Sequence, residues 1–139
     1  MDASVHVVKS REGTTQIKLI MKRQIKLAIV GGRDFSDYPY LTSKIDELRQ
    51  KYTVTEIVSG GARGADSLGE RYAKENHIPT KIFPAQWDVY GRSAGYKRNV
   101  LIVDECDMVA AFWDGCSKGT KLTINIAKQQ GKTVLIFKL

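Results

Sequence analysis

Three short apolar runs, each ending in a glycine-rich turn beside a cation, constrain the fold of this chain more than any other feature. The runs and their turns cover residues 25–36, 54–64 and 108–120. Each run is short and suits a buried strand, and each turn leads into apolar residues at helical spacing. The repeated order of strand, turn and helix predicts an α/β domain with a mostly parallel sheet.

The second turn, within residues 58–66 (VSGGARGAD), suits a phosphate group. The first turn of a helix presents unpaired backbone N–H groups and the positive end of the helix dipole, which together attract anions. Glycines let the backbone approach a ligand closely, while Arg63 adds a positive charge and Ser59 a hydroxyl. The other interpretation is a tight connection that needs glycine only for its turn.

The recurrence of this design favours the ligand. In an open parallel sheet the strand ends on one edge form a crevice, so we expect the three turns to converge on one pocket. The turns at 31–36 and 59–64 lack the spacing of the dinucleotide fingerprint, and no stretch matches the P-loop pattern ending in Gly-Lys-Ser/Thr. The sequence therefore predicts a nucleotide-like ligand that is held in another way.

Length and composition narrow the class of protein. The 139 residues suffice for one compact domain and are too few for two ordinary ones. Apolar residues make up 42% of the chain and charged residues 27%, which is typical of a soluble globular protein. No apolar run reaches the length of a membrane span and the N-terminus lacks the hydrophobic core of a signal peptide, so we expect a cytoplasmic protein without membrane contact.

Cysteine content and charge limit the partners. Cys106 and Cys116 lie on either side of a predicted buried strand, which favours a reduced pair, and with only two histidines no metal site is suggested. Residues 1–24 contain five Lys or Arg and two Asp or Glu, so they contribute +3 to the formal net charge of +7. We expect this basic extension to be either poorly ordered or an edge hairpin, before the domain at 25–139. Basicity favours anionic partners without choosing among them.

The spacing of apolar residues places the elements. The pattern predicts strands at 26–30, 54–58, 80–83, 108–113 and 133–137, and helices at 38–52, 65–76, 98–106 and 120–130. The alternation of five strands with four helices predicts a single three-layer domain, in which the strongly apolar run at 108–113 forms the central strand.

The long connection at 84–99 has a composition that can stack on a base and hold a phosphate, because it combines Trp87 and Tyr90 with cations and glycines. These two rings are the candidates for base stacking. The alternative is that they only pack the connection onto the body of the domain. Arg98 and Asn99 are better candidates for ligand contact, because we expect them at the start of the next helix, facing the edge that holds the turns.

These residues carry a resemblance to a known superfamily. Residues 58–66 resemble the loop of the DNA-processing Smf/DprA proteins, and residues 31–35 (GGRDF) and 111–120 (AFWDGCSKGT) look like the small, YspA-like branch of the same superfamily. That superfamily, SLOG, also contains the lonely-guy (LOG) phosphoribohydrolases. The resemblance covers residues 26–139. It implies a Rossmann-like domain whose glycine loops bind nucleotides or ADP-ribose-like molecules, as a sensor, processor or scavenger in bacterial or phage conflict systems.

One departure from the superfamily concerns catalysis. Lonely-guy enzymes carry acidic residues directly after the Gly-Thr pair and use them to cleave an N-glycosidic bond, whereas Lys121, Leu122 and Thr123 follow Thr120 here. A carboxylate can stabilise an oxocarbenium-like centre or activate water, and Lys and Thr cannot. Whether the chain is an enzyme therefore stays open. Another loop could supply the carboxylate, from Asp34, Asp66, Glu70, Asp88 or Asp114.

Asp66 and Asp114 are the catalytic candidates, and each has a structural alternative. Asp66 could act as a helix cap or first-turn acid, and Asp114 could fix its loop through a bond from side chain to backbone. The candidate ligand-binding residues come from the three turns and the predicted helix start. They are Gly31, Gly32, Arg33, Asp34, Ser59, Gly60, Gly61, Ala62, Arg63, Gly64, Asp66, Arg98, Asn99, Asp114, Gly115, Ser117, Gly119 and Thr120.

Three functions follow as hypotheses. The first is a module that binds a nucleotide or ADP-ribose-like ligand, favoured by the three turns and the missing acidic pair. The second is a nucleotide-processing hydrolase, and the third is DprA-like binding of single-stranded DNA, which would need a basic groove and stacking aromatics. No cofactor is identified, and Mg²⁺ would arrive only with bound phosphate. The resemblance also implies a homo-oligomer.

Overall fold

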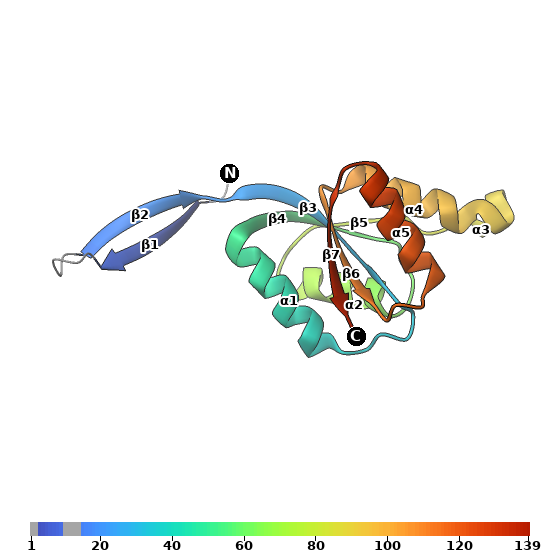
Figure 1. Ribbon diagram of the computed structural model, residues 1–139, viewed down its shortest axis with the longest axis horizontal. Helices are drawn as coiled ribbons and strands as arrows, with labels where there is room; N and C mark the ends of the chain where they lie inside the picture. Colours follow the sequence, from blue (N-terminus) through green and yellow to red (C-terminus); the bar gives the residue numbers. More distant parts are fainter. Residues whose placement is uncertain (1–2, 10–14) are drawn as a thin grey trace.

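A five-stranded, all-parallel sheet lies between two layers of helices (Figure 1). This computed structural model describes residues 3–9 and 15–139. The prediction of a three-layer, Rossmann-like α/β domain is confirmed. In spatial order the strands are β5 (Thr80–Ile82), β4 (Tyr52–Ser59), β3 (Arg23–Gly31), β6 (Met108–Trp113) and β7 (Thr133–Lys138).

The helices cover the two faces of the sheet in pairs. On one face α1 (Tyr38–Lys51) and α2 (Ala65–Glu75) pack against Leu27 and Ile29 of β3. On the other face α4 (Ala94–Glu105) and α5 (Lys118–Gln129) pack against Ala28 and Val30. Successive side chains of a strand point to opposite faces, so a strand covered on both faces needs a continuous apolar run.

The strand order reverses beside β3. Within the five-stranded sheet the chain passes first through β3, proceeds outward to β4 and β5, and then returns to the other side of β3 with β6 and β7. The prediction that residues 108–113 form the central strand is wrong, because β3 holds that place and β6 lies next to it. A continuous apolar run indicates that a strand is buried on both faces, which is true of β3 and of β6. It does not indicate where the strand lies in the order of the sheet. The reversal creates a switch point between β3 and β6, where ligands bind in open α/β sheets.

Two of the differences from the predicted boundaries change the location of residues that the sequence analysis singled out. The connection at 84–99 is largely helical, with α3 (Trp87–Tyr90), a 3-10 turn at Gly91–Ser93 and then α4. Because α4 begins at Ala94, Arg98 and Asn99 lie in its second turn rather than at its start. Tyr52 was expected at the end of the first helix; it is extended and opens β4, while its N–H donates to the Leu48 carbonyl.

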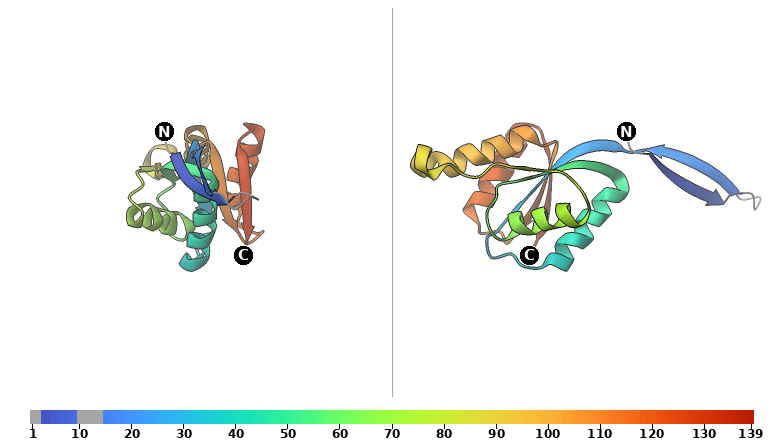
Figure 2. Two further views of the ribbon diagram at one scale, coloured as in Figure 1. Left: turned by 90° about the vertical axis from the view of Figure 1, so that its left-hand side faces the viewer. Right: turned by 180° about the vertical axis from the view of Figure 1, so that it is seen from behind.

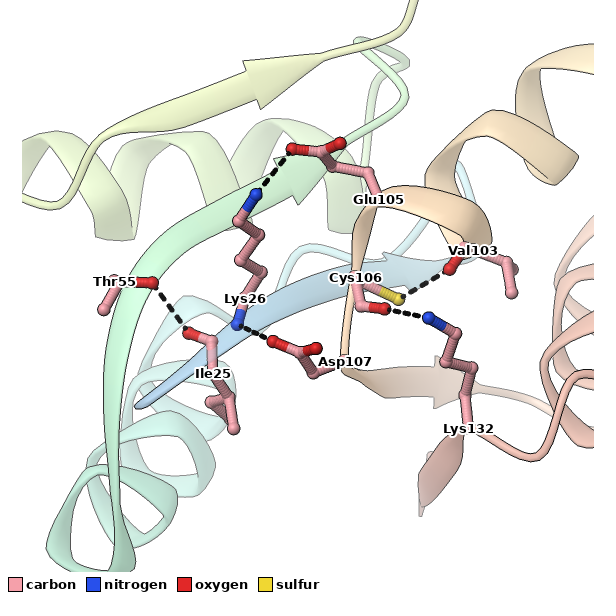
Figure 3. A network of polar contacts seen from close by, with 8 residues as sticks. All are labelled: Ile25, Lys26, Thr55, Val103, Glu105, Cys106, Asp107 and Lys132. Carbon is pink, nitrogen blue, oxygen red and sulfur yellow. Dashed lines mark hydrogen bonds and ion pairs between the residues drawn. The ribbon is translucent and has the colours of Figure 1, made fainter. Parts of the chain in front are cut away.

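The amino-terminal edge of the sheet is fixed by a polar network (Figure 3). Lys26 N–H donates to Asp107 Oδ2 over 2.8 Å, and Lys26 Nζ pairs with Glu105 Oε1 at 3.1 Å. Lys132 Nζ donates to the Cys106 carbonyl over 2.7 Å. Burial raises the pKa of the Cys106 thiol to about 11, so it stays protonated. Cys106 and Cys116 are both free, in line with the predicted reduced pair.

The N-terminal strands β1 (Ala3–Lys9) and β2 (Thr15–Met21) form a separate antiparallel hairpin. It extends away from the five-stranded sheet in Figure 1 and in the right-hand view of Figure 2. Within the part of the chain that the structure describes, its two strands pair with each other and with no strand of the large sheet.

Removing residues 1–20, so that the chain starts at Met21, is expected to leave the domain folded. The free energy of unfolding should change by less than about 1 kcal/mol, because the hairpin contributes no strand to the large sheet. Urea unfolding followed by circular dichroism measures this. A chain that starts instead at Leu27 loses buried Ile25 and should not fold stably. A large loss of stability on removing residues 1–20 alone would contradict the prediction.

Candidate functional site

A cavity of about 1030 Å³ opens at the carboxyl ends of β3 and β6. It lies at the switch point, between the turn after β3, the start of α2, the middle of α4 and the start of α5. Its size suits a ligand of drug or nucleotide dimensions. The first and third turns therefore converge on one cavity, as the sequence predicts, whereas the second turn supplies fewer of the lining residues.

The cavity contains two thirds of the predicted ligand-binding residues. Those that line it are Gly31, Gly32, Arg33, Asp34, Ala62, Asp66, Arg98, Asn99, Asp114, Ser117, Gly119 and Thr120. Those that do not line it are Ser59, Gly60, Gly61, Arg63, Gly64 and Gly115. The sequence analysis also left out several residues of the lining, namely Val30, Phe35, Ser36, Asp37, Tyr40, Ile102, Cys116, Thr123, Lys138 and Leu139.

The start of α5 presents backbone donors to the cavity. Ser117 is the N-cap residue, and its side chain makes no capping bond to the helix backbone. The N–H groups of the first turn are thus available to a ligand, at the positive end of the helix dipole. The Ser117 and Thr120 hydroxyls lie 3.1 Å apart beside them. This geometry can hold a phosphate or carboxylate oxygen.

Asp114 shapes the loop that precedes α5. Its Oδ1 accepts the N–H groups of Cys116 and Ser117 over 2.8 and 2.9 Å. These two bonds hold the pKa of the Asp114 carboxyl below its usual range. The structural alternative that the sequence offered for Asp114, a loop fixed by side chain to backbone bonds, is thus what the structure contains.

The second turn packs against the first. The buried Ser59 hydroxyl donates to Glu70 Oε2 over 2.7 Å and accepts the Gly61 N–H over 3.3 Å. Gly64 has a φ of 79°, and a Cβ there would lie 2.6 Å from the Arg33 carbonyl carbon. The contacts of Ser59 and Gly64 thus hold the second turn in place against α2 and the first turn.

Asp66 and Arg98 form the polar floor of the cavity. Asp66 is only 8% exposed, and its Oδ2 accepts the Ala62 N–H over 3.2 Å. Arg98 Nη1 donates to the Gly60 carbonyl over 2.7 Å, and Arg98 Nε is buried without a hydrogen-bond partner among the described residues. Burial raises the pKa of Asp66 to about 6, against the opposing effects of the Ala62 N–H and Arg98. Asp66 can therefore exchange a proton near neutral pH.

One wall of the cavity is aromatic. Phe35 stacks on the fully buried Phe112 with ring centroids 5.3 Å apart, and Tyr40 meets the same ring edge-on at 6.0 Å. Phe35 and Tyr40 both line the cavity. Aromatic side chains next to backbone donors are typical of small-molecule sites.

The rim carries exposed charges. Arg63 Nη2 lies 3.6 Å from Asp34 Oδ1, and both side chains are mostly in water, so this pair adds little stability. Arg33 is also exposed and lines the cavity. The exposed arginines of the rim can thus attract an anion, because no buried network of ion pairs among the described residues holds them.

Trp87 and Tyr90 are not part of the cavity. Both belong to α3 and are 52% and 46% exposed. The proposed stacking of a base on these rings is therefore not possible for a ligand confined to the cavity. Among the described residues no cluster of His, Cys, Asp and Glu could hold a metal ion, and no helix is long and apolar enough to span a membrane.

Comparison with known proteins identifies the family of this domain. Residues 25–90 match the sequence model of the YspA, cpYpsA-related SLOG family. The gene 61 protein of Mycobacterium phage D29 is 30% identical over an alignment of 119 residues, and the match covers 81% of this chain and 95% of that protein. The chain belongs to this SLOG family.

The SLOG domain also resembles a solved structure. The X-ray structure of DNA processing protein A (DprA) from Streptococcus pneumoniae matches with a TM-score of 0.65 and 22% sequence identity. The match covers 80% of this SLOG chain and 49% of the DprA chain. The two proteins share a fold, and the present chain corresponds to about half of DprA.

Proposed function

We propose that this SLOG protein binds a nucleotide or nucleotide-derived, ADP-ribose-like molecule in the cavity between β3 and β6, as a sensor or scavenger. The observation that carries the proposal is the uncapped start of α5, which opens into the same cavity as Arg33 and Arg98. Backbone donors and arginines together recognise phosphate groups, and the aromatic wall offers an apolar surface to the rest of the ligand. The phage origin of a relative fits a role in conflict between phage and bacterium.

The experiment is a ligand search on the purified full chain. Small molecules released by denaturation are identified by mass spectrometry, and nucleotides, cyclic nucleotides and ADP-ribose are screened by thermal shift. A ligand that binds only the folded state raises the melting temperature in proportion to the logarithm of its concentration. If none of these compounds binds while single-stranded DNA binds in a salt-sensitive way, the proposal fails and the nucleic-acid hypothesis replaces it.

Gly119→Glu is expected to weaken binding of a phosphate-bearing ligand by about 100-fold, because it places a carboxylate beside the donors that would receive the phosphate. No atom lies within 4 Å of a Cβ at Gly119, so the side chain has room. An acid in the first turn also suits the helix dipole, which keeps the fold stable. Isothermal titration with the ligand found in the screen measures the change.

Lys121→Gln is the matched control for Gly119→Glu. It also lowers the net charge of this helix by one unit, but at an exposed residue outside the cavity. Binding should change less than about threefold, as expected for an exposed charge that does not line the cavity and is screened by salt. Equal weakening by the two variants would indicate a general charge effect and contradict the assignment of the site.

A hydrolase is the second candidate, and one observation favours it. Asp66 is the buried carboxyl group of the cavity, and its pKa of about 6 suits a general acid or base. Mass spectrometry of each bound nucleotide after incubation separates the two functions. Loss of substrate with formation of product, abolished by Asp66→Asn, would establish turnover; unchanged ligand would establish a binding module.

A further inference from the structure

The strand β5 forms a free edge of the large sheet. It pairs with β4 on one side, and no described strand pairs with its other side. The Phe83 N–H, just after β5, donates to the Ser59 carbonyl of β4 over 2.8 Å. Alternate residues of a strand direct their main-chain groups to opposite neighbours, so Thr80 and Ile82 direct theirs away from β4. Both residues are exposed, so their N–H and C=O groups can pair with another extended chain.

A groove adjoins this edge. It has a volume of about 320 Å³ and lies between β5, α3 and α4. Its apolar lining includes Ile82, Phe83, Tyr90 and Leu101, of which all but Phe83 are exposed. Exposed apolar patches of this kind mark interaction sites. We call this hollow the β5–α4 groove.

Every charged residue that lines the β5–α4 groove is a cation, namely Lys81, Lys97 and Arg98. Lys81 Nζ lies 5.7 Å from the centroid of the Phe83 ring, and Lys97 Nζ lies 4.8 Å from that of Tyr90. Neither lysine forms an ion pair with a described residue. The groove is therefore complementary to a partner that carries acidic and apolar side chains together.

The same charges oppose the pairing of two copies of this chain through β5. In a symmetric pair both copies use the same surface, so cations of one groove would approach cations of the other. A lysine on a short edge strand also discourages nonspecific pairing, and Lys81 is the middle residue of β5. An acidic partner removes this repulsion.

We propose that the β5–α4 groove binds an acidic, extended segment of a partner protein, which adds to β5 as a further strand. The main-chain groups of Thr80 and Ile82 hold its backbone, the groove takes its apolar side chains, and Lys81 and Lys97 attract its acids. A peptide backbone matches the donor and acceptor spacing of a strand, and a sugar–phosphate backbone does not. This match favours a protein segment over a nucleic acid.

Fluorescence anisotropy with a synthetic peptide tests this proposal on the full chain. The labelled peptide has capped ends, two valines at alternate positions and glutamate at all others. It should bind with a Kd of about 100 µM, and the same peptide with lysine in place of glutamate should bind at least about tenfold more weakly. An acidic peptide with N-methylated main-chain amides keeps its charges but cannot donate to the edge, so it should also bind at least about tenfold more weakly.

Ile82→Pro tests the strand addition from the side of the protein. Proline removes the N–H that points away from β4, so binding of the acidic peptide should weaken by about tenfold. The hydrogen bond from Phe83 to β4 does not involve this N–H, so a thermal melt should show that the domain still folds. Ile82→Val is the matched control, because it keeps the N–H and should change binding by less than about twofold.

Lys97→Glu tests the charge of the groove. It places an acid where the acids of the peptide bind, so the affinity should fall by about tenfold. Lys81 also attracts Glu56 and Glu105, which do not line the groove, and is therefore not the lysine chosen. Lys128→Glu is the matched control at an exposed residue of α5 outside the groove, and it should change binding by less than about twofold.

Several results would overturn the proposal. One is an acidic peptide that does not bind at about 1 mM, or that binds no better than the basic one. Undiminished binding of the N-methylated peptide, or equal weakening by Lys97→Glu and Lys128→Glu, would also contradict it. A labelled single-stranded oligonucleotide that binds more tightly than the acidic peptide, and loses this binding with Lys97→Glu, would assign the groove to a nucleic acid instead. Arg98 lines the ligand cavity as well and is left unchanged, so a failure here does not bear on the proposed ligand site.

Discussion

Gly64→Ala is expected to cost about 4 kcal/mol of the free energy of unfolding, through backbone strain and collision together. Gly64 has a φ of 79°, a conformation that residues with a Cβ rarely adopt. A Cβ at this position would also meet the Gly32 carbonyl oxygen and lie 2.6 Å from the carbonyl carbon of Arg33. Both neighbours are backbone atoms, so neither can move aside by changing a side-chain rotamer.

The expected loss is a large part of the stability of a domain of this size. It should lower the melting temperature by about 15 °C, measured by differential scanning calorimetry. The Ala65 N–H donates to the Gly32 carbonyl over 3.2 Å, so the collision also separates the first turn from the start of α2. Any ligand affinity that depends on Arg33 or Asp66 should fall together with the stability.

Gly115→Ala is the control that separates strain from collision. Gly115 has a φ of 86°, but no atom lies within 4 Å of a Cβ at that position. Its substitution should therefore cost only about 1 kcal/mol of backbone strain. If Gly64→Ala and Gly115→Ala lost the same free energy of unfolding, the close packing of the first and second turns would not contribute to stability. That result would contradict the role assigned to Gly64.

The strands could be predicted from sequence because apolar continuity is a local property. The run at 108–113 has six consecutive apolar residues, and β6 covers these same residues. Tyr52 shows the limit of local reasoning. Its spacing from Leu48 fits the inner face of α1, yet it opens β4, where it pairs in register with Arg23. The spacing of apolar residues around Tyr52 cannot indicate its pairing with Arg23, because the two residues are 29 positions apart in the sequence.

The site could be predicted in part, for a reason that depends on topology. Parallel strands end at one edge, so the turns at Gly31 and at Asp114 to Thr120 had to meet there. The role of Ser59 could not be foreseen, since a hydroxyl beside glycines suits a ligand as well as it suits Glu70, its actual partner. Phe35 was passed over because it looks like an ordinary core residue, although it follows the first turn directly and forms the aromatic wall.

Asp66→Asn is expected to change how stability depends on pH. The pKa of Asp66 is about 6 in the folded protein, above its value of about 3.9 in an unfolded chain, so the folded state binds the proton more tightly. This group's contribution is therefore fully present below pH 4 and is lost as the pH rises through 6. The loss amounts to about 3 kcal/mol. Asn does not titrate and avoids this loss.

The measurement is urea unfolding of both proteins between pH 4 and pH 7.5. The difference in the free energy of unfolding should shift in favour of Asp66→Asn by about 2 kcal/mol across this interval, because an unfolded Asp is already about half ionised at pH 4. Other carboxyl groups with shifted pKa values, such as Glu56 and Glu75, are present in both proteins and cancel in the difference. Asp34→Asn is the control, because Asp34 lines the same cavity with a fully hydrated side chain. If the difference from wild type depended on pH for Asp34→Asn and not for Asp66→Asn, Asp66 would not be the group whose raised pKa links stability to pH.

The same variant separates the two candidate functions. An anionic ligand in the cavity is repelled by ionised Asp66, so Asp66→Asn should tighten its binding at pH 7.5 and change it little at pH 5, where the carboxyl group is mostly protonated. A binding module would thus gain affinity from the substitution. A hydrolase that uses Asp66 to move a proton would lose turnover with that same gain, because the amide cannot take the proton. The effect of Asp66→Asn on turnover and on affinity therefore distinguishes a binding module from a hydrolase.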